Sequence, residues 1–180
     1  MLEIEIKVQI EDRGPIRERI LASGGELLDK GIEFDAYYTS PTRDFAQTDE
    51  ALRLRHAGDI ALLTYKGPKT GTGSYKAREE LNVRIESSDT MDAILDRIGF
   101  VHTAVVRKYR ESYRLGQATV TLDEVDDLGT FAEIEAAGNL GQEDAEKEIE
   151  RIAGELGITG ERITRSYLEL LLEKQRSDQS

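Results

Sequence analysis

MLEIEIKVQI (residues 1–10) sets a pattern that later parts of the chain repeat. Apolar residues fill the even positions from 2 to 10, and charged or polar residues fill the odd ones. A period of two predicts a strand with one apolar face. The other face carries Glu3 and Glu5, two like charges one step apart. A second such pair, Glu133 and Glu135, follows much later in FAEIEAAG (residues 131–138), so the two pairs belong either to two solvated strands or to one shared acidic site.

The composition indicates one domain that does not depend on cysteine chemistry. The chain has 180 residues, of which 38% are hydrophobic and 33% charged. We expect a single domain over residues 1–174 and a disordered tail over 175–180. There are no cysteines, and His56 and His102 are the two histidines. Disulfides and thiolate sites are therefore excluded, and two histidines argue against a multi-histidine zinc site. Any metal should be bound by oxygen, which favours Mg²⁺, Mn²⁺ or Ca²⁺.

The charge balance argues against one broad class of partner. The formal net charge is −12, which argues against nucleic-acid binding through a basic surface. It also fits a second interpretation, adaptation to a salty cytoplasm. Neither a signal peptide nor an apolar run long enough to span a membrane is recognisable, so the sequence predicts a cytoplasmic protein without a membrane partner.

Strands dominate the predicted secondary structure. Short turns join most consecutive strands, so we expect a mainly antiparallel sheet. GPKTGTGS (residues 67–74) has the composition of a mobile loop. Strands are expected at about 1–10, 34–39, 51–56, 60–66, 75–85, 105–115, 118–125 and 131–136, and helices after Gly14 and at 88–98, 142–156 and 164–174.

Charges of one sign gather on one face of several predicted strands. Arg53 and Arg55 alternate with leucines, and Lys108 and Arg110 share a face. For any single strand, an ordinary half-buried sheet with polar residues in water explains this pattern. Segregation of basic and acidic pairs favours another interpretation. If the sheet closes, the charged faces line a polar lumen that holds a polyanion and the cations accompanying it.

These residues resemble the CYTH family, also called triphosphate tunnel metalloenzymes. The family's E-x-E-x-K signature matches Glu3, Glu5 and Lys7. The remaining motifs follow in the family's order over residues 1–136: Arg53 and Arg55, Lys66, Lys108 and Arg110, Asp123, and Glu133 and Glu135. The segments RDFAQTDEALRLR and LDEVDDLGTFAEIE are most similar to the class IV adenylyl cyclase branch.

The resemblance implies an α+β, strand-dominated fold, a closed antiparallel eight-stranded β-barrel that forms a tunnel, with flanking helices. It also implies a triphosphate substrate with Mg²⁺ or Mn²⁺ and a possible homodimer. The implied substrate-binding residues are Lys7, Arg53, Arg55, Lys66, Arg78, Lys108 and Arg110. The implied catalytic residues are Asp123, Lys108 and Arg110. The implied metal ligands are Glu3, Glu5, Glu133, Glu135 and Asp123.

Two departures from the family pattern bear on the site. Some relatives have Glu-x-Glu on the middle strand, where this chain has Glu80, Leu81 and Asn82. The triphosphatase branch uses a basic residue from its C-terminal helix, for which Arg165 and Lys174 are candidates.

The resemblance leaves the reaction open. We expect an adenylyl cyclase that converts ATP to cyclic AMP and pyrophosphate. The alternative is a triphosphatase acting on thiamine triphosphate or tripolyphosphate. A non-catalytic module that binds polyphosphate or nucleotides is a third interpretation, which the loss of a carboxylate at Asn82 would favour.

Overall fold

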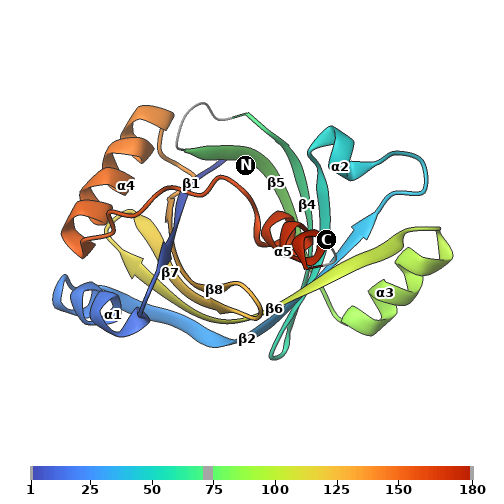
Figure 1. Ribbon diagram of the computed structural model, residues 1–180, viewed down its shortest axis with the longest axis horizontal. Coiled ribbons are helices and arrows are strands. Elements are labelled where there is room, and N and C mark those ends of the chain that lie inside the picture. The colour runs from blue at the N-terminus through green and yellow to red at the C-terminus, as the bar shows by residue number, and fades with distance from the viewer. Residues whose placement is uncertain (1, 71–74, 179–180) are drawn as a thin grey trace.

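The computed structural model describes residues 2–70 and 75–178, and its centre is a closed antiparallel barrel (Figure 1). Neighbouring strands follow the order β1-β5-β4-β3-β2-β6-β7-β8, and β8 pairs with β1 to close the ring. The predicted eight-stranded barrel is thus confirmed. The strands are β1 (Leu2–Ile10), β2 (Glu26–Thr39), β3 (Ala51–Ala57), β4 (Ile60–Lys69), β5 (Lys76–Ile85), β6 (Val101–Leu115), β7 (Ala118–Val125) and β8 (Gly129–Ala136).

Helices cover much of the apolar outer face of the barrel. Because side chains alternate across each strand, the polar side chains then face the inside. α1 (Arg13–Ala22) and α4 (Gln142–Leu156) pack on β1, β7 and β8 around a core that includes Ile6, Val120, Ile134, Ile149 and Ile152. α2 (Phe45–Thr48) and α3 (Ser88–Arg97) cover β3 and β4 through Phe45 and Leu95. No helix within residues 2–70 and 75–178 is both long and apolar enough to cross a membrane.

The C-terminal helix lies at one opening of the barrel. α5 (Tyr167–Ser177) follows a segment that leaves α4 and crosses this opening (Figure 1). Ile163 donates its amide to the carbonyl of Lys7, which ties the segment to β1. Ser166 caps the helix in a capping box with Glu169. Tyr167 and Leu171 then pack with Val106 and Phe131, so the start of α5 reaches into the barrel.

Several boundaries differ from the sequence expectation. β2 begins at Glu26 rather than near 34, because it pairs with β6 along its whole length despite its exposed, charged start. β4 extends to Lys69, into the segment expected as a mobile loop, where it pairs with Arg78 of β5. Residues 71–74 of that expected loop lie outside the described residues. α5 continues to Ser177, into the tail expected to be disordered, and the short α2 was not expected.

Candidate active site in the barrel lumen

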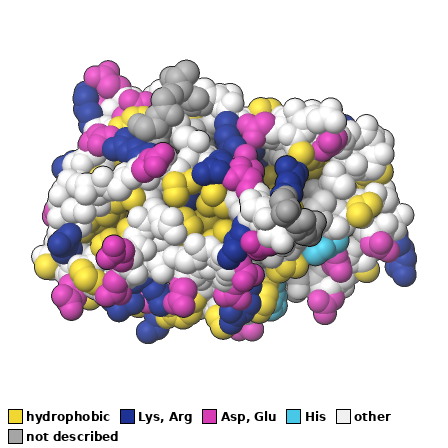
Figure 2. All heavy atoms as spheres, in the orientation of Figure 1, with side chains coloured by type: hydrophobic (Ala, Val, Ile, Leu, Met, Phe, Trp, Pro, Cys, Tyr) yellow, Lys and Arg dark blue, Asp and Glu magenta, His cyan; other side chains and the backbone are white. Residues whose placement is uncertain are grey.

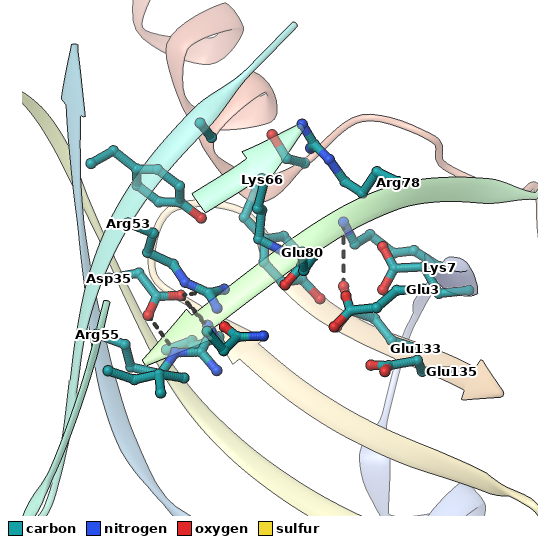
Figure 3. A pocket seen from close by; sticks show the side chains of 18 of the residues that line it. Glu3, Lys7, Asp35, Arg53, Arg55, Lys66, Arg78, Glu80, Glu133 and Glu135 are labelled. Carbon is teal, nitrogen blue, oxygen red and sulfur yellow. Dashed lines mark hydrogen bonds and ion pairs between the residues drawn. The ribbon is translucent and has the colours of Figure 1, made fainter. Parts of the chain in front are cut away.

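The barrel encloses a polar cavity of about 240 Å³ (Figure 3). Register explains why charged side chains converge there, since directly paired residues of antiparallel strands point to the same face. Glu133 pairs with Lys7, Glu5 with Glu135, Lys66 with Glu80, and Arg55 with Asp35. The lining comprises Glu3, Glu5, Lys7, Asp35, Tyr37, Ala51, Arg53, Arg55, Leu62, Lys66, Arg78, Glu80, Asn82, Lys108, Arg110, Glu133, Glu135, Ser166 and Tyr167.

Three of the predicted phosphate-binding cations meet at one buried carboxylate, Asp35. Arg55 donates to both of its oxygens, from Nε at 2.6 Å and Nη2 at 2.7 Å. Lys108 Nζ donates at 2.7 Å, and Arg53 Nη1 lies at 3.8 Å. Burial raises the pKa of Asp35, but Lys108, Arg53 and Arg55 outweigh it and hold that pKa well below its usual value. Asp35 is therefore an ionised anchor for the cations around it.

Arg110 occupies a second buried junction. Its guanidinium donates to both oxygens of Asp123, at 2.7 and 2.5 Å, and to Glu133 Oε2 at 2.7 Å. Tyr167 donates its hydroxyl to the same Asp123 at 2.9 Å. Asp123 is fully buried behind these partners. This arrangement favours a role in which Asp123 orients Arg110 over direct contact with substrate or metal.

The remaining predicted cations line the cavity with different partners. Lys7 Nζ donates to the carbonyl of Arg165 at 3.0 Å, lies 3.3 Å from Glu133, and sits over the Tyr167 ring at 4.1 Å. Lys66 forms an ion pair with Glu80. Arg78 donates to the carbonyls of Gly67 and Asp49. Its guanidinium thus joins the end of β4 to the residues just before β3, and only its remaining donors could bind phosphate.

Four predicted metal-binding carboxylates, Glu3, Glu5, Glu133 and Glu135, line the same cavity. Burial raises the pKa of Glu135 to about 7, and Glu3, Glu5 and Glu133 add to the increase through charge repulsion. Such a cluster has the hard oxygen donors that Mg²⁺ and Mn²⁺ prefer. Among residues 2–70 and 75–178, no three acidic or histidine side chains already form a metal-binding group. The carboxylates nevertheless fit a cation that takes part of its shell from this cluster and the rest from phosphate oxygens and water.

The structure also shows partners outside the set of site residues that the CYTH resemblance implies, although the sequence already makes Asp35 a candidate for positioning a tunnel base. Asp35 and Glu33 are buried beside the cations, and Glu33 Oε2 lies 3.0 Å from Lys108 Nζ. Their signal was the alternation of Glu33, Asp35 and Tyr37 in EFDAY (residues 33–37). Tyr167 carried no comparable signal, because a tyrosine in an amphipathic helix is usually a packing residue. Asn82 lines the lumen and accepts a hydrogen bond from Thr64 at 2.7 Å.

Neither candidate for a basic residue from the C-terminal helix lines the described cavity. Arg165 lies just before α5 and forms an ion pair with Glu173. Lys174 donates to the carbonyl of Asp127. The carbonyl of Arg165 rather than its side chain reaches Lys7.

A closed barrel with cations and carboxylates facing one lumen defines a tunnel protein suited to polyanions. Residues 1–167 match the CYTH domain model, and the chain belongs to this family. It is 38% identical over 173 residues to "Putative adenylate cyclase MJ0240" of Methanocaldococcus jannaschii, covering 94% of this chain and 98% of that protein. It is 27% identical to "Adenylate cyclase CyaB" of Aeromonas hydrophila, covering 93% of this chain and 87% of that protein.

Solved structures show the same fold. PH1819 of Pyrococcus horikoshii has a TM-score of 0.82 and 39% identity, covering 96% of this chain and 99% of that one. HpAC1 of Hippeastrum has a TM-score of 0.73 and 21% identity, covering 96% of each chain. That protein is described as a putative adenylyl cyclase with a dominant triphosphatase activity.

Proposed function

We propose that the chain is a divalent-metal-dependent enzyme that converts ATP to cyclic AMP and pyrophosphate. The observation that supports this most is the lumen, where the predicted phosphate-binding cations and the predicted metal ligands face one another across a single cavity. The adenylate cyclase names of two curated relatives favour this reaction.

Within the proposal, the chain's own residues position charge rather than form covalent bonds. Arg53, Arg55, Lys108 and Arg110 bind phosphate oxygens, with arginine supplying paired donors and lysine a compact charge. Asp35 and Asp123 keep these cations oriented. Glu133 and Glu135, with Glu3 or Glu5, would hold Mg²⁺ or Mn²⁺, and this cation would neutralise charge on the phosphates. The ribose 3′-hydroxyl gives its proton to water and bonds to the α-phosphorus, while the bond from this phosphorus to the pyrophosphate oxygen breaks and pyrophosphate leaves.

A triphosphatase is the second candidate, supported by a recess at the Arg110 end of the lumen. Arg110 lines both the lumen and a hollow whose lining also includes Asp29, Lys30, Glu33 and Asp59. Hydrolysis needs water at the terminal phosphorus, and such a hollow gives water a route to this end. In this reaction water bonds to the terminal phosphorus, the bond from this phosphorus to the bridging oxygen breaks, and orthophosphate and the remaining diphosphate are released.

One assay separates the reactions. The protein is incubated with ATP, tripolyphosphate or thiamine triphosphate, each with Mg²⁺ and with Mn²⁺, and products are resolved by ion-exchange chromatography. Cyclic AMP with pyrophosphate supports the cyclase, and orthophosphate without cyclic AMP supports the triphosphatase. Binding without turnover contradicts both and leaves a non-catalytic binding module.

A further inference from the structure

Glu33 is a buried carboxylate between the lumen and the hollow that Asp29 and Asp59 help to line. Its side chain is 12% exposed and lines this hollow of about 350 Å³, whereas Arg110 lines both the hollow and the lumen. The other opening of the barrel is the one that α5 crosses, and Figure 2 shows basic and acidic side chains around it. Glu33 thus stands where the proposed phosphate site meets a second route to solvent.

Strand register gives the inward side chains of β2 and β3 a fixed order along the barrel. The paired levels are Tyr37 with Arg53, Asp35 with Arg55, and Glu33 with Ala57. Tyr37 belongs to one core cluster with Tyr167 at the start of α5, so Glu33 lies two levels further from that helix. The next inward position of β2 is Gly31, where an added Cβ would meet no atom within 4 Å. Glu33 is therefore the last bulky inward side chain of β2 before open space begins.

One oxygen of Glu33 faces three of the cations that we expect to bind phosphate. Its Oε2 lies 3.0 Å from Lys108 Nζ, 3.2 Å from Arg55 Nη1 and 3.9 Å from Arg110 Nε. Burial raises the pKa of Glu33, but Arg110, Lys108 and Arg55 outweigh it and lower that pKa, so the carboxylate is ionised. A negative oxygen among three cations takes a position that would otherwise suit a phosphate oxygen.

Glu33 does not orient these cations in the way that Asp35 and Asp123 do. The three cations already donate hydrogen bonds to Asp35 or Asp123. Oε2 of Glu33, by contrast, accepts no hydrogen bond from any residue in the described ranges, 2–70 and 75–178. A carboxylate that is not needed to place the cations still repels any phosphate group that approaches it, and such like-charge contacts are a means of rejecting a ligand.

We propose that Glu33 determines how long a phosphate chain the lumen can bind, by ending the row of phosphate positions after the third group. A fourth phosphate group in line would have to take the place of the carboxylate among its three cations. The inference rests on the proposed function, because it takes the lumen as the triphosphate site. It goes further by assigning chain-length specificity to a residue outside the set that the CYTH resemblance implies.

The test compares phosphate chains of different length. Affinities for pyrophosphate, tripolyphosphate and tetrapolyphosphate are measured by calorimetry, with Ca²⁺ in place of Mg²⁺ to limit turnover. For the wild type, we expect affinity to rise from pyrophosphate to tripolyphosphate and to rise no further with the fourth group. Glu33→Gln keeps the size of the side chain but removes the charge that holds it among the cations. This variant should bind tetrapolyphosphate about tenfold more tightly than tripolyphosphate, because the fourth group gains hydrogen bonds to charged donors.

Glu80→Gln is the matched control. It also removes one carboxylate from the barrel interior, but on β5 beside Lys66 rather than beside the hollow. Either variant makes the lumen more positive and can raise all affinities alike, so the readout is the ratio of the tetrapolyphosphate affinity to the tripolyphosphate affinity. Glu80→Gln should keep the wild-type ratio. A wild-type ratio in Glu33→Gln, or an equal increase of the ratio in both variants, would overturn the proposal.

A second position tests whether the fourth group advances past residue 33 toward the hollow. In the Glu33→Gln background, Gly31→Glu adds a carboxylate where the backbone has open space beside it. This double variant should lose the preference for tetrapolyphosphate. Gly31→Glu alone should leave tripolyphosphate binding within about twofold of the wild type, because three groups do not reach this level. A preference that persists in the double variant would overturn the proposal.

The wild-type measurements separate this proposal from the proposed function, and they do not depend on the folding of any variant. Affinity that keeps rising from tripolyphosphate to tetrapolyphosphate would overturn the role of Glu33 and leave the lumen as a triphosphate site. Absence of binding for all three phosphates and for ATP would overturn both.

Discussion

Lys108 Nζ lies 2.7 Å from Asp35 Oδ2, and each of these two residues is 1% exposed. Burial lowers the pKa of Lys108, and the Asp35 carboxylate opposes that decrease. A phosphate that binds in the lumen would therefore contact lysine and arginine side chains that the Asp35 carboxylate already holds in position. The same pairing limits the repulsion among Lys108, Arg53 and Arg55 when no phosphate is bound.

Asp35→Asn should therefore lower the free energy of unfolding by about 3 to 5 kcal/mol, the range for breaking a buried charge pair. Guanidinium-induced unfolding of the variant and the wild type measures this difference in the free energy of unfolding. Asp29→Asn changes an exposed aspartate on the same strand and should have little effect. Tripolyphosphate should raise the melting temperature of the Asp35 variant more than that of wild type, because the added anion replaces the lost carboxylate. Equal ligand-induced shifts would contradict this role of Asp35.

Arg55→Ala should raise the KM for ATP, because Arg55 lines the lumen and its guanidinium can donate two hydrogen bonds to a phosphate. Hydrogen bonds to charged groups contribute about 1.5 to 3 kcal/mol, so the constant should rise roughly 10- to 150-fold. Initial rates over a range of ATP concentrations measure the change. Arg114→Ala, on the outer part of β6 with a side chain 60% exposed, is the matched control. An unchanged constant would remove Arg55 from the substrate site.

The barrel could be predicted because its inward faces carry an unusual sequence pattern. Glu3, Glu5 and Lys7 are charged at every second position, and the same spacing recurs in Arg53 and Arg55 and in Glu133 and Glu135. Since side chains alternate strictly across a strand, each set had to share one face. The ordered motifs of the CYTH resemblance then placed these faces in a single tunnel, which the closed strand order confirms.

The contacts that join the cations to one another could not be predicted in the same way. Asp35 and Asp123 each anchor an arginine from a neighbouring strand, and those contacts depend on the exact register of paired strands, which alternation within one strand does not fix. Tyr167 reaches Asp123 because α5 enters the barrel, an arrangement set by helix packing rather than by any local pattern. The cavity of about 270 Å³ that Phe45 and Leu172 line likewise exists because α2 and α5 come together at the opening.

Glu133→Gln should abolish metal-dependent turnover while the fold stays intact. Glu133 lines the lumen and contacts Lys7 and Arg110, and it belongs to no apolar core cluster. Loss of a metal-binding carboxylate should lower activity by about 100-fold or more. Turnover at several Mn²⁺ and Mg²⁺ concentrations measures it, and circular dichroism checks the fold. Glu124→Gln, with a side chain 59% exposed on the neighbouring strand, should retain wild-type rates. Wild-type rates in the Glu133 variant would remove Glu133 from the site.

Glu135 should make the stability of the metal-free protein fall as pH rises from about 5 to 8. Its pKa is about 7 in the folded chain, against 4.5 for an ordinary glutamate, first because of burial and then because of Glu3, Glu5 and Glu133. The folded state binds the proton more tightly than the unfolded state, so the associated stability is present below pH 4.5 and is lost as pH rises through about 7.

Glu135→Gln removes this titration and should flatten the dependence, with a difference between the two pH profiles on the order of 3 kcal/mol. Urea unfolding in the presence of EDTA, at half-unit steps of pH, measures both profiles. Glu143→Gln, whose side chain is 84% exposed, should follow the wild type. Adding Mg²⁺ at pH 8 should stabilise the wild type more than the Glu135 variant, because a cation offsets repulsion among ionised carboxylates. Parallel profiles for wild type and Glu135→Gln would show that Glu135 does not titrate in this range, and would argue against a crowded acidic cluster in the lumen.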